Sequence, residues 1–210
     1  MAKIVRSSAV TANVLMPGVR MRCPACRANG NFEPILQYDA ATQTGEILGL
    51  RRCPNPTCSA LVFFVRDRAG ALQSFPAERI DFDTKDIPQG LHDAFEEAIT
   101  CHAEQCFVAA AIMVRKTLEL ICHDRGATGA NLKERLAALR SKVILPTELF
   151  DGLDYLRLLG NDAAHIESQI FDQVGEQEVE ASIEFTKEVL KATYQLKGLV
   201  EKIRALKKTP

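Results

Sequence analysis

The sequence predicts an α+β protein in which a small β-rich segment, residues 1–85, precedes an all-α helical bundle, residues 86–210. The charge balance changes between the two, because the first segment has 11 Lys and Arg against 7 Asp and Glu, and the second has 15 against 20. Turn residues and short β-type runs lie mainly in the first segment, whereas long helical periodicity with few Gly or Pro residues fills the second. The content of 47% hydrophobic and 25% charged residues is typical of a protein with a packed core.

The β-rich segment contains two runs of strand-forming residues, at positions 35–38 and 61–65. Apolar, aromatic and β-branched side chains dominate both runs, which is typical of short strands. Residues 75–88 hold two prolines and several charged side chains. We therefore expect this stretch to connect the two segments.

The second segment is predicted to form four or five helices. Their expected ranges are about 89–103, 104–125, 131–142, 146–166 and 176–207. No Gly or Pro separates the first two ranges, so the boundary between them is weakly defined. Asn131 is a suitable N-cap for the third helix, because its side chain can accept a hydrogen bond from the first helical turn.

The composition excludes several classes of protein. The net charge of −1 excludes a strongly basic coat for nucleic acid. No window has the roughly 18 consecutive apolar residues of a membrane span, and the N-terminus lacks the apolar run of a secretory signal. We therefore expect a cytoplasmic protein with no membrane partner, in which spaced cysteines more often bind metal than form disulfides.

Four of the seven cysteines form two pairs, Cys23-x2-Cys26 and Cys53-x4-Cys58. Two such pairs let four thiolates surround one ion, and Zn²⁺ prefers a tetrahedron of this kind. The alternatives are four unrelated free thiols or a redox-active first pair, although a redox motif would need a βαβ context that is missing here. The arrangement resembles a zinc ribbon over about residues 19–67. Because four thiolates leave no open coordination position, the expected cofactor is a structural Zn²⁺.

Basic side chains flank both cysteine pairs and predict either a local basic patch or an ordinary solvated face. They are Arg20, Arg22, Arg27, Arg51 and Arg52. A basic patch beside the cysteines would favour nucleic acid as a partner, since phosphate contacts drive such binding.

A polar ladder is predicted on the fourth helix. Arg157, Asn161 and His165 recur every four residues beside an apolar stripe. An arginine can stabilise a phosphate, a histidine can transfer protons near neutral pH, and an asparagine can orient either one, so the three are candidate catalytic residues for a phosphodiester. In the structural alternative, Arg157 instead pairs with Asp154 or Glu119. Asn161 then bonds the backbone, and His165 caps the helix.

These motifs resemble a bacterial family of the HEPN superfamily, itself a domain of unknown function, over about residues 86–199. The matching residues are Arg115-x3-Glu119 on one predicted helix and Arg157-x2-Gly160-Asn161-x-Ala163-Ala164-His165 on another. The resemblance implies a helical bundle that forms a homodimer, and an N-terminal zinc ribbon is a familiar companion. Many HEPN domains are metal-independent endoribonucleases of toxin–antitoxin, phage-defence and CRISPR systems.

In those enzymes an arginine and a histidine on one helix, separated by a short spacer, meet their copies across the dimer. Here Gly160 stands where that arginine is usual, and Arg157 lies three residues earlier. The small residues of the motif also let a second helix approach closely, as at a dimer seam. Two functions stay open. The first is an endoribonuclease that acts on RNA through Arg157, Asn161 and His165. The second is a non-catalytic dimeric adaptor with a structural zinc site, which binds nucleic acid or a partner protein of a defence system.

Overall fold

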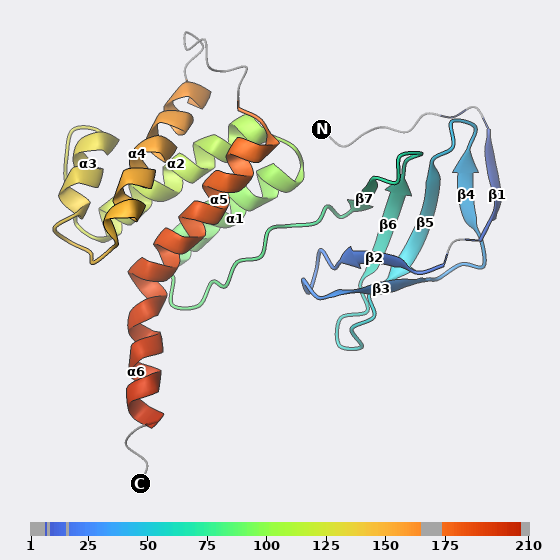
Figure 1. Ribbon diagram of the computed structural model, residues 1–210, viewed down its shortest axis with the longest axis horizontal. Helices are drawn as coiled ribbons and strands as arrows, with labels where there is room; N and C mark the ends of the chain where they lie inside the picture. Colours follow the sequence, from blue (N-terminus) through green and yellow to red (C-terminus); the bar gives the residue numbers. More distant parts are fainter. Residues whose placement is uncertain (1–6, 8, 16, 165–173, 207–210) are drawn as a thin grey trace. The chain divides into compact units, whose positions relative to one another are not determined.

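Figure 1 shows the computed structural model of the chain, which divides into two compact units, Met1–Asp81 and Phe82–Pro210. The structure describes residues 7, 9–15, 17–164 and 174–206, and for residues 12–13 and 159–164 it describes the backbone alone. Within these ranges the first unit is built of strands and the second of helices, so the predicted α+β class is confirmed.

The first unit is an antiparallel sheet of seven strands within the described residues. The strands are β1 (Val10–Val14), β2 (Val19–Arg22), β3 (Asn29–Pro34), β4 (Asp39–Thr42), β5 (Ile47–Arg52), β6 (Leu61–Arg66) and β7 (Leu72–Phe75). Strand β5 is central, because it pairs with β3 and β4 along one edge and with β6 along the other. Strands β1, β2 and β7 extend the sheet beyond β4, β3 and β6.

Alternating burial explains strand β6. The side chains of Val62 and Phe64 are fully buried, while Leu61 and Phe63 are exposed. A period of two is the pattern of a strand with one face in the core. The strand predicted at residues 61–65 is therefore confirmed.

The strand predicted at residues 35–38 is wrong, because these residues form a bend between β3 and β4. Both neighbouring strands pair with the same edge of β5, so the chain between them only has to move along that edge. Leu36 and Tyr38 are exposed, so the side chains that predicted a strand do not reach the core.

The second unit is a helical bundle. Its helices are α1 (Gln89–Ala103), α2 (Phe107–Asp124), α3 (Leu132–Leu139), α4 (Thr147–Ala164), α5 (Glu176–Leu190) and α6 (Leu196–Leu206), with a π-helical turn η2 (Lys191–Gln195) between the last two. Helix α2 packs against α1, α4 and α5, and it buries Val114, Leu118 and Ile121 in the core. No helix in the described part of the chain has the length and apolar content that crossing a membrane requires.

Two of the helix ends predicted from neighbouring residues agree with the structure, and one does not. Helix α1 has the predicted range, and the Asn131 side chain accepts a hydrogen bond of 3.0 Å from the backbone N–H of Glu134, as expected of an N-cap. The second helix begins at Phe107 rather than at residue 104. Gln105 adopts a left-handed conformation, with φ of 60°, and so separates α1 from α2 without a glycine.

The last predicted helix is interrupted by η2, and contacts with distant segments fix this turn. The side-chain amide of Gln195 donates hydrogen bonds to the carbonyls of Asp83 and Lys85, at 2.7 and 2.9 Å. The hydroxyl of Tyr194 donates to Asp124 at 2.8 Å. These bonds set the direction in which α6 leaves the bundle, and Figure 1 shows α6 extending beyond the other helices of its unit.

Candidate metal centre and the helical cluster around Arg157

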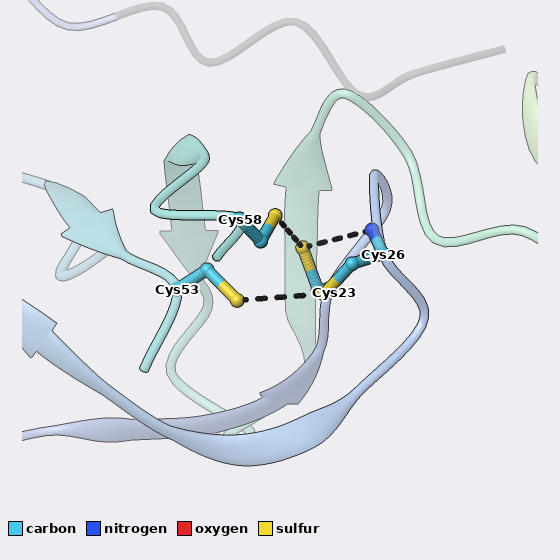
Figure 2. A group of neighbouring side chains, drawn as sticks. All are labelled: Cys23, Cys26, Cys53 and Cys58. Atoms are coloured by element: carbon cyan, nitrogen blue, oxygen red, sulfur yellow. Dashed lines mark hydrogen bonds between the residues drawn. The ribbon is translucent and has the colours of Figure 1, made fainter. Parts of the chain in front are cut away.

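Four cysteines come together at one end of the sheet, as Figure 2 shows. Cys23 directly follows β2 and Cys53 directly follows β5. Cys26 and Cys58 lie in the turns that come next. Strand β3 pairs with both β2 and β5, so the sheet itself links the two turns.

Each cysteine turn is closed by backbone hydrogen bonds and a left-handed residue. In the first turn, the N–H of Arg27 donates to the carbonyl of Cys23 at 2.9 Å, and Arg27 has a φ of 63°. In the second, the N–H groups of Cys58 and Ser59 donate to the carbonyl of Asn55 at 3.0 and 2.9 Å, and Ser59 has a φ of 48°. Glycine adopts this conformation at least cost, so both turns are held in shape by their surroundings.

The sulfur positions fit a tetrahedral metal ion. All four Sγ atoms lie within 4.8 Å of one another. The Sγ atoms of Cys23 and Cys58 are 3.8 Å apart, and those of Cys26 and Cys53 are 3.7 Å apart. Metal–sulfur bonds of about 2.3 Å in a tetrahedron place the sulfurs about 3.8 Å apart. The four thiols could therefore hold one metal ion, and the alternative of four unrelated thiols is excluded.

Burial and hydrogen bonding make the four thiols unequal. Cys23 and Cys53 are 1% and 3% exposed and belong to the apolar core of the sheet. A backbone hydrogen bond from Ala28 lowers the pKa of Cys26 to about 6. Burial raises the pKa of Cys53 to about 12. A buried thiol of this kind gives up its proton when a cation takes its place, so a metal ion bound here would release protons.

Asn55 supports the centre, and the sequence reasoning missed it. Its side-chain Nδ2 donates to the Sγ of Cys26 at 3.6 Å, and its Oδ1 accepts from the backbone N–H of Thr57 at 3.1 Å. Hydrogen bonds of this kind orient the ligands and spread the negative charge of thiolates. The available signal was its position between Cys53 and Cys58.

Two of the five flanking arginines pair with a single acid. Arg22 and Arg27 each lie 3.0 Å from a carboxylate oxygen of Asp81. Arg20 and Arg52 are exposed. The predicted basic patch is therefore reduced by ion pairs within the first unit.

The fifth arginine is not at the surface at all. Arg51 is completely buried and forms a two-pronged ion pair with Asp39, at 2.9 and 2.5 Å. Its guanidinium also lies 4.5 Å from the centre of the Phe64 ring. A buried guanidinium needs such partners, because leaving a charge unpaired in the core is costly. Arg51 therefore stabilises the sheet and is no part of a basic patch.

The helical cluster forms where α2 meets α4. The side chain of Arg157 is 17% exposed, and its Nε lies 3.5 Å from Oδ1 of Asp154. From α2, Arg115 donates a hydrogen bond of 3.3 Å to the carbonyl of Arg157, and its Nε lies 3.3 Å from Glu119. The structure thus brings Arg115 and Arg157 together, and it shows the ion pair between Arg157 and Asp154 that the structural alternative expects.

The side chains of the other two residues of the polar ladder, Asn161 and His165, are not among those that the structure describes. Asn161 lies on α4, in the stretch where the backbone alone is described, and His165 lies outside the described residues. A joint catalytic role of Arg157, Asn161 and His165 stays a prediction. The same holds for the small-residue seam at residues 160–164.

Comparison with known proteins finds a family for the helical unit. A family model described as Domain of unknown function (DUF4145) matches residues 96–208, which is more than half of the chain. The match includes Arg115, Glu119 and Arg157 and leaves out the sheet with its cysteine cluster. No curated protein and no solved structure matches the chain.

Proposed function

This chain belongs to the DUF4145 family, and we propose that it is a non-catalytic, dimeric binding module, with a zinc ribbon as its first unit and a HEPN-like bundle as its second. The cysteine cluster carries the proposal. Four protein thiols at tetrahedral distances leave a bound Zn²⁺ with no position for water or substrate. A closed site of this kind stabilises a fold instead of performing chemistry.

Zn²⁺, when bound, would cross-link the two cysteine turns of a small sheet. Cys23, Cys26, Cys53 and Cys58 would hold the ion, and Asn55 would orient Cys26 through its hydrogen bond. Small domains often need such a link, because their cores bury little apolar surface. The role we propose for the metal is therefore structural.

The pairing of charges in the helical unit supports binding over catalysis. Arg157 is largely buried and lies beside Asp154, whereas a guanidinium that stabilises a phosphate must offer free N–H donors. The partner we propose is a nucleic acid, in the first place RNA, or a protein of a bacterial defence system. The resemblance to HEPN proteins supports this choice of partner.

A metal-independent endoribonuclease is the second candidate, and one observation favours it. The Nε of Arg157 makes no hydrogen bond among the described residues, since its 3.5 Å contact with Asp154 is an ion pair only, so a rotation of the side chain would offer this donor to a phosphate oxygen. In this reaction His165 would take the proton of a ribose 2′-hydroxyl, whose oxygen attacks the adjacent phosphorus. The bond to the 5′-oxygen then breaks, that oxygen receives a proton, and Arg157 stabilises the charge on the phosphate.

RNA cleavage distinguishes the two candidates, and metal content tests the zinc ribbon that both share. The purified chain is analysed for zinc and then incubated with RNA of mixed sequence, with and without EDTA, beside His165→Ala and Arg157→Ala. His123→Ala is the matched control, because His123 is an exposed histidine of the same unit. The binding module predicts about one zinc per chain, RNA or protein binding, and no cleavage. Cleavage that resists EDTA, disappears in both variants and persists in the control would establish the endoribonuclease instead.

A further inference from the structure

Helix α6 has an apolar face that no element in the described part of the chain covers. Its large apolar side chains are Leu196, Leu199, Val200, Ile203 and Leu206, which are 40–78% exposed. Contiguous apolar side chains on the surface of a helix mark a site of interaction, because their exposure to water is unfavourable. The exposed face therefore indicates a missing partner.

The same face borders a groove of about 720 Å³. The groove is lined by Leu196 and Leu199 of α6 and by Ile144 and Leu149 around the start of α4. Asp83, Lys85 and Asp86 also line it. Ile144 is 97% exposed. Apolar grooves beside a helix are typical seats for a second amphipathic helix.

The groove is preformed, because α6 is held in place where it begins. The bonds from Gln195 to the carbonyls of Asp83 and Lys85 connect the start of α6 to one side of the groove. Gly198 permits close contact there, since a Cβ at this position would lie 3.3 Å from the carboxylate of Asp86. A rigid surface of this kind binds a partner with little loss of conformational freedom.

We propose that this surface docks α6 from a second copy of the chain, with each copy placing its helix in the groove of the other. The spacing of the apolar face supports a copy of itself as the occupant. Leu196, Leu199, Ile203 and Leu206 follow one another at steps of three, four and three, the spacing of a coiled-coil seam. Two identical faces are self-complementary around a two-fold axis, so the contact closes as a dimer.

The charges around the groove also match a second α6. Outside α6, the groove is lined by three acids and two bases, which are Asp83, Asp86 and Glu188 with Lys85 and Lys191. Helix α6 itself carries Lys197, Lys202 and Arg204 against the single acid Glu201. A rim with an excess of acids therefore suits an incoming helix with an excess of bases.

This inference rests on the proposed function, in which two chains form a dimer. It specifies the contact surface of that dimer, which it places on α6 and not on the small residues 160–164. Sedimentation velocity and light scattering on the full chain, from 1 to 100 µM, test it. We expect a mass of twice 23.2 kDa for the wild type. The double variant Leu199→Asp with Ile203→Asp is expected to weaken the dimer at least 100-fold. Ala205→Asp, with the same change on the other side of α6, is expected to leave it intact.

The outcomes distinguish the proposed contact through α6 from dimer formation itself. Both aspartates lie on an exposed helix, so circular dichroism should show an unchanged fold. A double variant that stays dimeric overturns the α6 seam and leaves the pairing in place. A monomeric wild type at 100 µM overturns both, and α6-dependent binding of that monomer to anionic vesicles or RNA would identify another occupant. Neither result bears on zinc content or RNA cleavage, which test the proposed function separately.

Discussion

The buried ion pair between Arg51 and Asp39 allows a sharp test of how the first unit is held together. The two side chains are 0% and 3% exposed and meet through two hydrogen bonds. Asp39→Ala leaves the guanidinium in the core without a counter-charge, which costs about 3–5 kcal/mol. A unit of this size is stable by roughly 4–12 kcal/mol. The substitution is therefore expected to remove a large share of the free energy of unfolding.

Hydrogen–deuterium exchange of the metal-loaded protein measures this loss where it occurs, in peptides that cover β4, β5 and β6. Asp39→Ala should speed their exchange strongly, whereas Glu33→Ala, which removes an exposed acid from β3, should leave it unchanged. Replacing both partners, with Asp39→Leu and Arg51→Met, should restore much of the protection because no charge stays unpaired. The reasoning is refuted if Asp39→Ala changes the opening free energy of β5 by less than about 0.5 kcal/mol.

Three further predictions concern the cysteines and their turns. Cys53→Ser is expected to abolish zinc binding, as measured by metal analysis after dialysis. The control Cys106→Ser, which lies outside the cluster, is expected to keep one zinc per chain. Equal zinc content in the two variants would contradict the assigned site. Ser59→Gly is expected to stabilise the first unit by about 0.5–1 kcal/mol in the same exchange assay, because glycine adopts the φ of 48° at this position without the strain of a Cβ. A loss of protection from exchange would show that no strain is stored there. Burial raises the pKa of Cys122 to about 11, so iodoacetamide at pH 8 should modify the exposed Cys106 and spare Cys122. Equal labelling of the two cysteines in mass spectrometry would disprove this difference in reactivity.

Local chemistry explains what the sequence predicted well in the fold. The range of α1 and the N-cap at Asn131 depend on residues only a few positions apart. The start of α2 was missed because Gln105, with no glycine or proline beside it, adopts the left-handed conformation that ends α1. The bend at residues 35–38 was missed because its cause is the pairing of β3 and β4 with one edge of β5.

In the candidate sites too, features set by nearby residues were predictable and features set by distant contacts were not. The cysteine cluster was predictable, because a metal site leaves a fixed spacing of thiols in the sequence. The role of Arg51 was not, since its partner Asp39 lies on another strand and only the folded sheet brings the two together. The π turn before α6 depends on the bond from Gln195 to Asp83, which joins residues 112 positions apart. Periodicity alone therefore predicted one continuous helix.

Internal pairing of charges limits how this protein can recognise a partner. Arg22 and Arg27 share the single carboxylate of Asp81, and Arg115 lies beside Glu119, so these cations are engaged before any ligand arrives. Affinity for nucleic acid without sequence preference comes from phosphate contacts and falls steeply with salt. With these three arginines paired, RNA binding by this chain should depend less on salt than on the shape of the RNA. A steep salt dependence would instead show that the exposed arginines of the sheet, such as Arg52, dominate the contact, and it would favour the basic-patch interpretation over a specific binding surface.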